Sequence, residues 1–351
     1  MRSLTPSQRE TDDRGAVLVL VAVMMTALIG MAALVIDIGS LYVEKRQLQN
    51  GGDAAALAVA QDCAAGDCGN ERTMAQTYAN NNASDNSSTV DAINGVCGVG
   101  PSLAACTDPP PTLPTGSLGW VRVRTSTATP DGGDEVDFFL APVINGGSGG
   151  TVRASAVAAW GVAGQTIVAP LIFSACEYEE LGGSIDTDPA TFPSSAPNYI
   201  FFHNPTSSPS AAVGRCVPRP AGQDIPGGFG WVAGSTSCSL DVTAGTWVPA
   251  DTGNNVPRGC TPSTWLNTEL IISIYDQTRG TGSNSEYRVL GFVGFVVLGY
   301  RFGGSNRAPS GFSCPGSPGA NCLYGRFTRF SRSTGGFGGP DLGGRVIRMV
   351  G

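Results

Sequence analysis

The chain has 351 residues, of which 41% are hydrophobic and 14% charged, with 49 glycines, 24 prolines and a formal net charge of −7. This much apolar sequence excludes a disordered protein, and the glycine and proline content favours a loop-rich globular one. An acidic chain with a single histidine, His203, also has nothing that resembles a nucleic-acid-binding module.

The first predicted element is an apolar segment at 16–36, which contains no charged residue. A helix of this length is about 31 Å long, which matches the hydrocarbon core of a bilayer. A cleaved signal peptide is the alternative, because arginines precede the segment and small residues lie near its end. The apolar run exceeds the roughly 7–15 residues of a signal h-region. We therefore predict a tail at 1–14 and a retained transmembrane helix at 15–36.

All ten cysteines follow this segment, and none forms a Cys-x-x-Cys pair. Zinc sites need closely paired Cys and His, so we predict disulfides in an oxidising exterior and no metal site. The N-terminus is then cytoplasmic and the C-terminal part extracytoplasmic. Our default pairing joins nearest neighbours: Cys63 with Cys68, Cys97 with Cys106, Cys176 with Cys216, Cys238 with Cys260, and Cys314 with Cys322.

A stalk helix at 37–62 is predicted next. Leu34, Leu41, Leu48 and Ala55 recur every seven residues, so one apolar stripe continues out of the membrane segment. This stripe packs either against the protein's own globular part or against a partner helix. We expect Gly51-Gly52 to weaken or kink the helix, because each glycine costs about 1 kcal/mol relative to alanine.

The segment 14–60 resembles the N-terminal part of TadG-like proteins of tight-adherence (Tad/Flp) pilus systems. The family's recurring features match Arg14, Gly15, Asp37, Gly39, Leu48, Gln49, Asp53, Ala54, Ala55, Ala56, Leu57 and Ala58. The sheet-forming stretch and cysteine-containing domain that follow resemble the arrangement in actinobacterial members.

The resemblance implies a bacterial cell-membrane protein that contacts other pilus-assembly or pilin subunits through its helix. It also implies a possible prepilin-peptidase boundary between Gly15 and Ala16. Pilins of this machinery carry glutamate five residues into the mature helix, where this chain has Leu20. The substitution favours an accessory or minor pilin-like component over a major pilin.

A loop-rich α+β domain with a small antiparallel sheet is predicted at 63–164. Its strands are expected at 120–125, 135–140 and 151–160, after a polar stretch with asparagine and proline runs.

A cysteine-containing, β-rich domain is predicted at 165–351, with strands at 167–173, 199–203, 229–233, 269–275, 286–302, 323–330 and 345–350. The run 289–300 is apolar on both faces and predicts a central buried strand bent at a glycine. The fold class is therefore α+β: a transmembrane and stalk helix followed by a disulfide-stabilised, mainly antiparallel β ectodomain.

Charge is divided unevenly along the chain. From Arg279 onward there are nine arginines and two acids, net +7, whereas the preceding part carries 12 basic and 26 acidic residues, net −14. Arginines scattered over solvent-exposed strand faces explain this without a ligand. A contact between the basic part and an acidic cell-wall polymer, a lipid headgroup or the acidic middle of the chain itself is the sharper alternative.

Candidate catalytic patterns are weak. Gly146 to Gly150 satisfies G-x-S-x-G around Ser148, but it reads as a linker between strands rather than a nucleophile elbow. The acids Glu177, Glu179, Glu180, Asp186 and Asp188 lie close to Cys176, and we expect them to be solvated rather than to bind calcium or cleave glycosides. We predict no catalytic residue, cofactor or metal.

These observations favour a non-enzymatic, single-pass membrane-anchored component of a Tad/Flp-type pilus assembly. A membrane-anchored adhesin or wall-binding module unrelated to piliation is the alternative, and an anchored hydrolase is the third reading.

Overall fold

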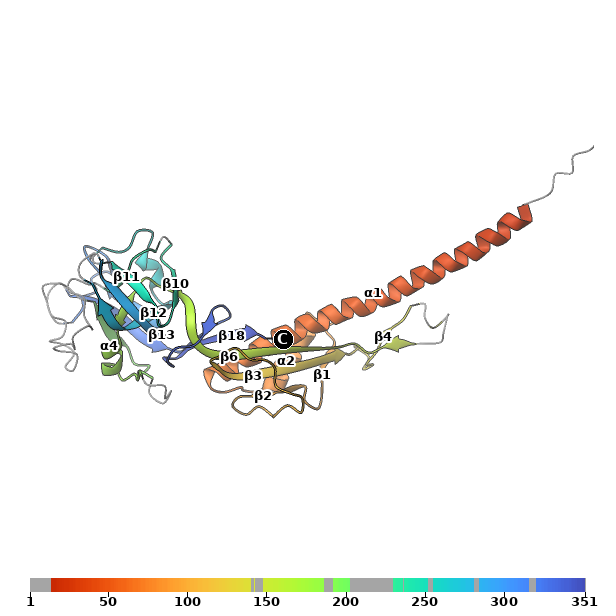
Figure 1. Cartoon of the computed structure of the whole chain (residues 1–351), viewed down its shortest axis with the longest axis horizontal. Coiled ribbons are helices and arrows are strands. Elements are labelled where there is room, and N and C mark those ends of the chain that lie inside the picture. Colours follow the sequence, from red (N-terminus) through yellow and green to blue (C-terminus); the bar gives the residue numbers. More distant parts are fainter. Residues whose placement is uncertain are drawn as a thin grey trace, which may run out of the picture.

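The computed structural model describes residues 14–139, 142, 148–185, 192–202, 230–235, 237–251, 255–280, 284–315 and 320–350. Figure 1 shows a long helix that projects from one end of an elongated molecule, with a β-rich lobe at the other end. The α+β class predicted from the sequence is confirmed: an apolar N-terminal helix precedes a mainly antiparallel β region that contains disulfides.

Helix α1 extends over Arg14–Ala65, 52 residues. It remains helical through Gly51-Gly52, so the expected interruption is absent. A second helix, α2 (Glu71–Asn82), packs against it in a segment that the sequence predicted to be loop-rich. The Asn70 side chain caps α2 by accepting the Thr73 backbone N–H at 3.2 Å. Sequence reasoning took the nearby asparagines for a break and so missed this helix.

The helices pack on the first sheet, whose order is β1-β3-β6-β18-β16. Strand β2 pairs with β3, while β10 and β17 pair with β6. The bounds are β1 Ser88–Val90, β2 Val96–Val99, β3 Ser117–Thr127, β6 Arg153–Val168, β10 Leu240–Thr243, β16 Phe330–Arg332, β17 Gly336–Phe337 and β18 Gly344–Met349. These pairs are antiparallel except β16 with β18.

The second sheet has the order β7-β12-β13-β11-β9, with β14 and β15 on β13 and β8 on β15. The bounds are β7 Ile172–Ser174, β8 Asn198–Phe202, β9 Trp231–Val232, β11 Trp247–Asp251, β12 Glu269–Arg279, β13 Glu286–Arg301, β14 Arg307–Ala308 and β15 Asn321–Thr328. Strand β13 is the predicted central strand, because β12 and β15 pair with it on either side. Its register against β15 shifts between Val297 and Gly299, next to the expected glycine bend.

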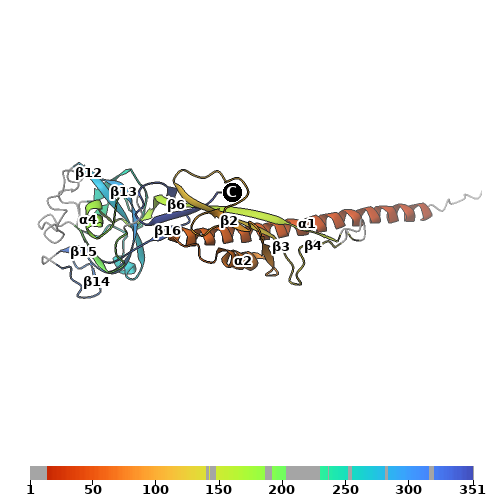
Figure 2. The same cartoon turned by 90° about the horizontal axis from the view of Figure 1, so that it is seen from below.

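Four apolar clusters occur among the described residues, and one of them, formed by Trp120, Val157 and Ala159, lies on β3 and β6. The other three run along the molecule. One lies between α1, α2 and the first sheet, one lies within the distal lobe, and the third joins β6 and β18 to β12 and β13. The predicted domain boundary at 164/165 falls inside β6, and β18 brings the C-terminal end of the chain back beside that strand. Figure 2 shows this continuity from below. The two β regions therefore share one long strand.

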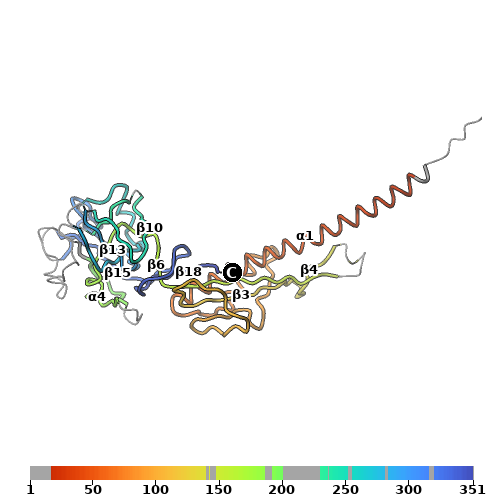
Figure 3. Tube along the Cα trace, in the orientation of Figure 1, coloured from red at the N-terminus to blue at the C-terminus, as the bar shows by residue number. Residues whose placement is uncertain are grey.

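A two-stranded ribbon of β4 (Val136–Asp137) and β5 (Gly149–Gly150) extends from the ends of β3 and β6. We call the described residues 128–139 and 148–152 the arm. The tube in Figure 3 shows the arm leaving the sheet on the side toward which the exposed part of α1 projects. Within the described part of the strand predicted at 135–140, only β4 forms, and Phe138 and Phe139 do not extend it; residue 140 lies outside the described residues.

Candidate anchoring and docking helix

The N-terminal half of α1 is apolar and exposed. Its large hydrophobic side chains from Val17 to Val43 are more than half exposed, except Leu41, which is half-buried. Among the described residues, one helix is long and apolar enough to cross a membrane; its most apolar 18-residue window has a mean hydropathy of 2.7 and is 6% buried. The one hydroxyl of this segment is satisfied locally, because Thr26 Oγ1 donates to the Ala22 carbonyl at 2.8 Å.

A covered stripe follows one face of α1. Ala33 is 1% exposed, Asp37 7% and Leu48 2%, whereas most side chains around Ala33 and Asp37 are exposed. The spacing of three to four residues is that of a single helix face. Of the stripe predicted from the sequence, Leu48 and Ala55 are buried and Leu41 is half-buried, but Leu34 is 62% exposed. Inside the apolar segment the covered position is Ala33 instead.

Asp37 is the acid that ends the apolar segment. Its carboxyl oxygen Oδ1 accepts the backbone N–H of Phe139 in the arm at 2.8 Å. Ser40 Oγ donates to the Asp37 carbonyl at 2.7 Å, one turn further along. Asp37 therefore joins α1 to the arm across 102 residues of sequence, a contact that periodicity alone does not reveal.

Leu48 and Gln49 attach α1 to the first sheet. The Leu48 carbonyl accepts Thr125 Oγ1 at 3.0 Å. Gln49 Nε2 donates to Asp53 Oδ1 at 2.7 Å and to the Ser155 carbonyl at 3.3 Å. Three of the family-motif positions thus form one polar seam along the helix, and Lys45 Nζ adds a bond to the Arg153 carbonyl.

Small residues bring α1 close to its neighbours. Ala55 and Ala56 are fully buried, while Ala54, Leu57 and Ala58 are half-buried. A Cβ at Gly51 would lie 3.1 Å from the Cα and carbonyl oxygen of Ala79 in α2, and one at Gly52 would lie 3.4 Å from the Ala156 Cβ in β6. The glycine pair is therefore a packing feature between α2 and the sheet.

Other family-motif positions make fewer packing contacts. Among the described residues, nothing lies within 4 Å of a Cβ built on Gly39. Gly15 and Ala16 belong to the first turn of α1, which begins at Arg14. The cleavage boundary predicted between them stays a prediction.

Glu44 is half-buried beside the same seam. Burial raises its pKa above the ordinary value; a hydrogen bond to Thr127 opposes this, and the nearby charge of Asp85 adds to it. The residue lies beyond the apolar segment, on the part of α1 that the sheet begins to cover.

Disulfides brace the region beyond α1. Cys63–Cys68, Cys97–Cys106, Cys238–Cys260 and Cys314–Cys322 are bonded, as nearest-neighbour pairing predicts. Cys176 is also disulfide-bonded, and Cys216 lies outside the described residues. Closing loops of this size restricts the unfolded chain, and thereby stabilises the fold by up to a few kcal/mol each.

Among the residues that the structure describes, the hydrolase candidates are not brought together. Ser148 precedes β5 and is exposed, and its carbonyl accepts the Phe138 N–H at 3.0 Å. His203 lies outside the described residues, as do Asp186 and Asp188. No group of three metal-ligating side chains occurs among the residues that the structure describes.

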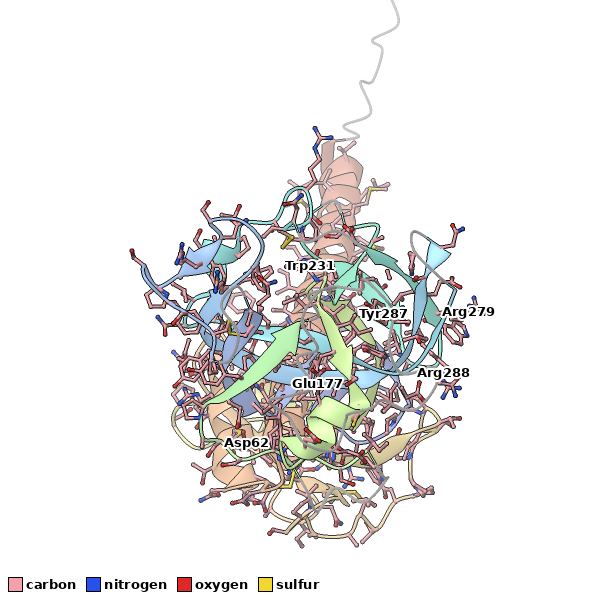
Figure 4. The ribbon with its side chains drawn as sticks, turned by 90° about the vertical axis from the view of Figure 1, so that its left-hand side faces the viewer. Asp62, Glu177, Trp231, Arg279, Tyr287 and Arg288 are labelled. Carbon is pink, nitrogen blue, oxygen red and sulfur yellow. A yellow bond between two sulfur atoms is a disulfide. The ribbon has the colours of Figure 1, made fainter. Side chains whose placement is uncertain are left out.

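Glu177 corrects the expectation of solvated acids. It is 7% exposed and forms a capping box with Ser174 at the start of α4 (Ala175–Glu180), where Ser174 Oγ accepts the Glu177 N–H at 3.2 Å. Figure 4 labels Glu177 beside this short helix. Burial also raises the pKa of the adjacent Tyr178. Glu179 and Glu180 belong to the same helix.

Comparison with known proteins gives one match. Residues 15–62 fit the model of a family described as putative Flp pilus-assembly TadE/G-like. No curated protein and no solved structure matches the chain. The match covers the exposed apolar part of α1 and most of the part that packs on the first sheet, and it ends before Cys63.

Proposed function

From the premise that residues 15–62 form a TadE/G-like Flp pilus-assembly segment, we propose that this protein is a non-enzymatic accessory or minor pilin-like component of a Tad/Flp-type pilus assembly. It crosses the bacterial cell membrane once through the apolar half of α1. Its N-terminus is cytoplasmic, and its disulfide-bonded β region lies outside. The observation that carries the proposal is the single helix that is both pilus-type in sequence and continuous with a packed ectodomain.

The continuity of α1 supports retention of the anchor. The helix continues from the apolar segment into the core without a break, and its C-terminal half supplies fully buried Ala55, Ala56, Val59 and Ala60. A cleaved signal peptide ends in a processing site that a peptidase must reach. Here the small residue Ala33 near the end of the apolar segment is 1% exposed.

The exposed apolar face of α1 is the surface proposed to contact other pilus subunits within the bilayer. Such helix–helix contacts depend on side-chain packing rather than on hydrophobic burial, since lipid is equally apolar. Leu20, 57% exposed, makes this contact without a buried charge. The protein then associates with a pilus assembly without forming the filament itself.

The test is deletion of the gene followed by complementation. Deletion is expected to abolish or sharply reduce pili counted by electron microscopy, and the full chain to restore them. A chain in which 17–32 is replaced by an unrelated transmembrane segment keeps the ectodomain and anchor, and is expected to fail in complementation. Normal piliation after deletion contradicts the proposal and favours the adhesin reading, which binding of the ectodomain to cell surfaces then tests.

Orientation has its own measurement. A C-terminal epitope tag is expected to be digested when protease is added to intact spheroplasts, while an N-terminal tag is protected. Thiol alkylation under denaturing, non-reducing conditions is expected to label none of the ten cysteines. Protection of the C-terminal tag contradicts the proposed topology.

A further inference from the structure

The arm lies at the depth where α1 leaves its apolar segment. The Phe139 backbone N–H donates to Asp37 Oδ1 at 2.8 Å, and Asp37 is the first charged residue after the segment 16–36. In a membrane-spanning α1, the end of the uncharged run marks the edge of the hydrocarbon core. The hydrogen bond therefore fixes Phe139 at the membrane surface.

The base of the arm is held firmly against α1. A Cβ at Gly150 would lie 3.5 Å from Leu41 Cδ2 and 3.1 Å from the Phe138 ring, so these three groups are packed together. The Phe138 N–H also donates to the Ser148 carbonyl at 3.0 Å across the ribbon. One phenylalanine is thus used to attach the ribbon to the helix.

Phe139 is turned the other way. Its side chain is 74% exposed, although its backbone is bonded to the buried Asp37. Moving a phenyl ring from water into the lipid interface is favourable, and Phe139 lies at the level of the membrane surface. An exposed ring at this position would therefore be more stable in lipid than in water. In the sequence, the five residues after Phe139, 140–144, carry no charge.

The covered face of α1 supports the same position of the arm relative to the membrane. Ala33, one helical turn before Asp37, is 1% exposed, although it belongs to the apolar segment. Ala33 lies about 6 Å from Asp37 along the helix axis, at 1.5 Å per residue. The protein's own covering of α1 therefore continues past the edge of the hydrocarbon core.

We propose that the arm is a second membrane-contacting element, in which Phe139 inserts into the outer part of the bilayer next to α1. The occupant of this surface is lipid, because the Phe139 backbone is bonded to Asp37, where the exposed apolar half of α1 ends. The contact sets the tilt and rotation of the ectodomain on the membrane, since two attachment points define an orientation that a single helix leaves open. The inference rests on the proposed membrane anchor.

The experiment uses the full chain in phosphatidylcholine vesicles and compares two single-tryptophan additions. Phe139→Trp reports on the arm. Leu118→Trp is the control, because Leu118 is also exposed, at 52%, but lies at the opposite end of β3 from the arm. Nine residues of strand separate Leu118 from Thr127, about 30 Å. The signal of the wild-type chain, with its five native tryptophans, is subtracted.

Lipid brominated in the upper acyl chain is expected to reduce the Phe139→Trp signal by about two-fold or more and to leave Leu118→Trp unchanged, because an inserted aromatic ring lies in the interface. Aqueous acrylamide is expected to quench Leu118→Trp more strongly. Equal quenching by acrylamide without quenching by bromolipid overturns the proposal. So does protection from both quenchers, which indicates that protein covers the ring.

Vesicle flotation separates this inference from the proposed function. If the chain floats with the vesicles and the Phe139→Trp signal is unaffected by bromolipid, the arm proposal fails and the membrane anchor stands. If the chain remains at the bottom of the gradient, the membrane anchor fails and the arm proposal fails with it.

Discussion

Asp37 joins two segments that are far apart in the chain, and it does so with one carboxyl oxygen. It is 7% exposed, and the hydrogen bond that it accepts is partly buried. An amide that loses its acceptor in such a place costs roughly 1–3 kcal/mol. A residue recognisable as part of a family motif thus has a specific structural role in this chain.

Replacing Asp37 by alanine is expected to release the arm. The Phe139 amide should exchange with deuterium about ten-fold faster, which corresponds to about 1.4 kcal/mol for one hydrogen bond. Hydrogen-exchange mass spectrometry of the detergent-solubilised chain measures this. Asp37→Asn is the control, because its carbonyl oxygen keeps an acceptor in place. Unchanged exchange in Asp37→Ala contradicts the assignment of this bond.

Asp341 and Arg345 form the most enclosed ion pair among those described, with side chains 9% and 11% exposed. Arg345 Nη2 donates to Asp341 Oδ2 at 2.7 Å and Nη1 to Oδ1 at 2.5 Å. Burial by itself raises the pKa of Asp341, but the hydrogen bonds and charge of Arg345 outweigh it and hold the pKa below the ordinary 3.8.

The pair predicts a pH dependence. Because the folded pKa is lowered, the unfolded chain binds the proton more tightly, so the pair stabilises the fold above pH 3.8 and loses this contribution as the pH falls through the folded pKa. Asp341→Asn leaves Arg345 without its charge partner and is expected to lower the free energy of unfolding by about 3 kcal/mol at neutral pH. The difference between variant and wild type should shrink in acid. A difference independent of pH contradicts this.

At the scale of elements, the two halves of α1 have different surroundings. Its first half has the length and composition for lipid, and its second half has the small residues that close packing needs. Composition predicted the first half, and the periodicity of apolar residues predicted the second. The sequence did not reveal that the glycine pair allows α2 to approach closely. This packing offsets the cost of two glycines in helix propensity.

Leucine at Gly51 is expected to be destabilising by about 1–3 kcal/mol, because its Cβ already meets the Ala79 backbone at 3.1 Å and backbone cannot move aside easily. Gly39→Leu is the matched control on the same helix, since no described atom lies within 4 Å of its Cβ. It should be neutral or slightly stabilising, because helix propensity rises. Thermal melts in detergent distinguish the two. Equal melting temperatures for both variants contradict a packing role for Gly51.

At the scale of the whole molecule, the two sheets are connected through β6 and β18. Val346, fully buried in β18, belongs to the core that also contains Val168 of β6 and Phe292 of β13. A change in this core is therefore felt on both sides of the predicted boundary at 164/165. The β regions should unfold together rather than in turn.

Val346→Ala is expected to lower the free energy of unfolding by about 2 kcal/mol through lost burial and the cavity left behind. Hydrogen exchange should accelerate to a similar extent in peptides from β3 and from β13, which lie in different sheets. Acceleration confined to β3 contradicts the coupling and restores two independent domains.

Prediction from sequence succeeded where the signal is local. Periodicity located α1 and the covered part of its stripe at Leu48 and Ala55, but it placed Leu34, which is exposed, where Ala33 is covered. The alternation of apolar residues located most long strands, including β3, β6, β12 and β13. It missed α2, whose asparagines are common in turns, and the short strands β10 and β11, whose pairing is decided by partners distant in sequence. Glu177 was placed in solvent because capping depends on the turn that Ser174 begins.

The sequence by itself determined the apolar segment, the helix that continues it, the β-rich remainder and the resemblance that the family match supports. Each of these depends on neighbouring residues or on a repeat of a few residues. Only the tertiary structure decided that Asp37 holds the arm, that Gly51 faces α2 and that β18 returns to β6. Those contacts join residues far apart in the chain, and their energies depend on burial and geometry that no local pattern encodes.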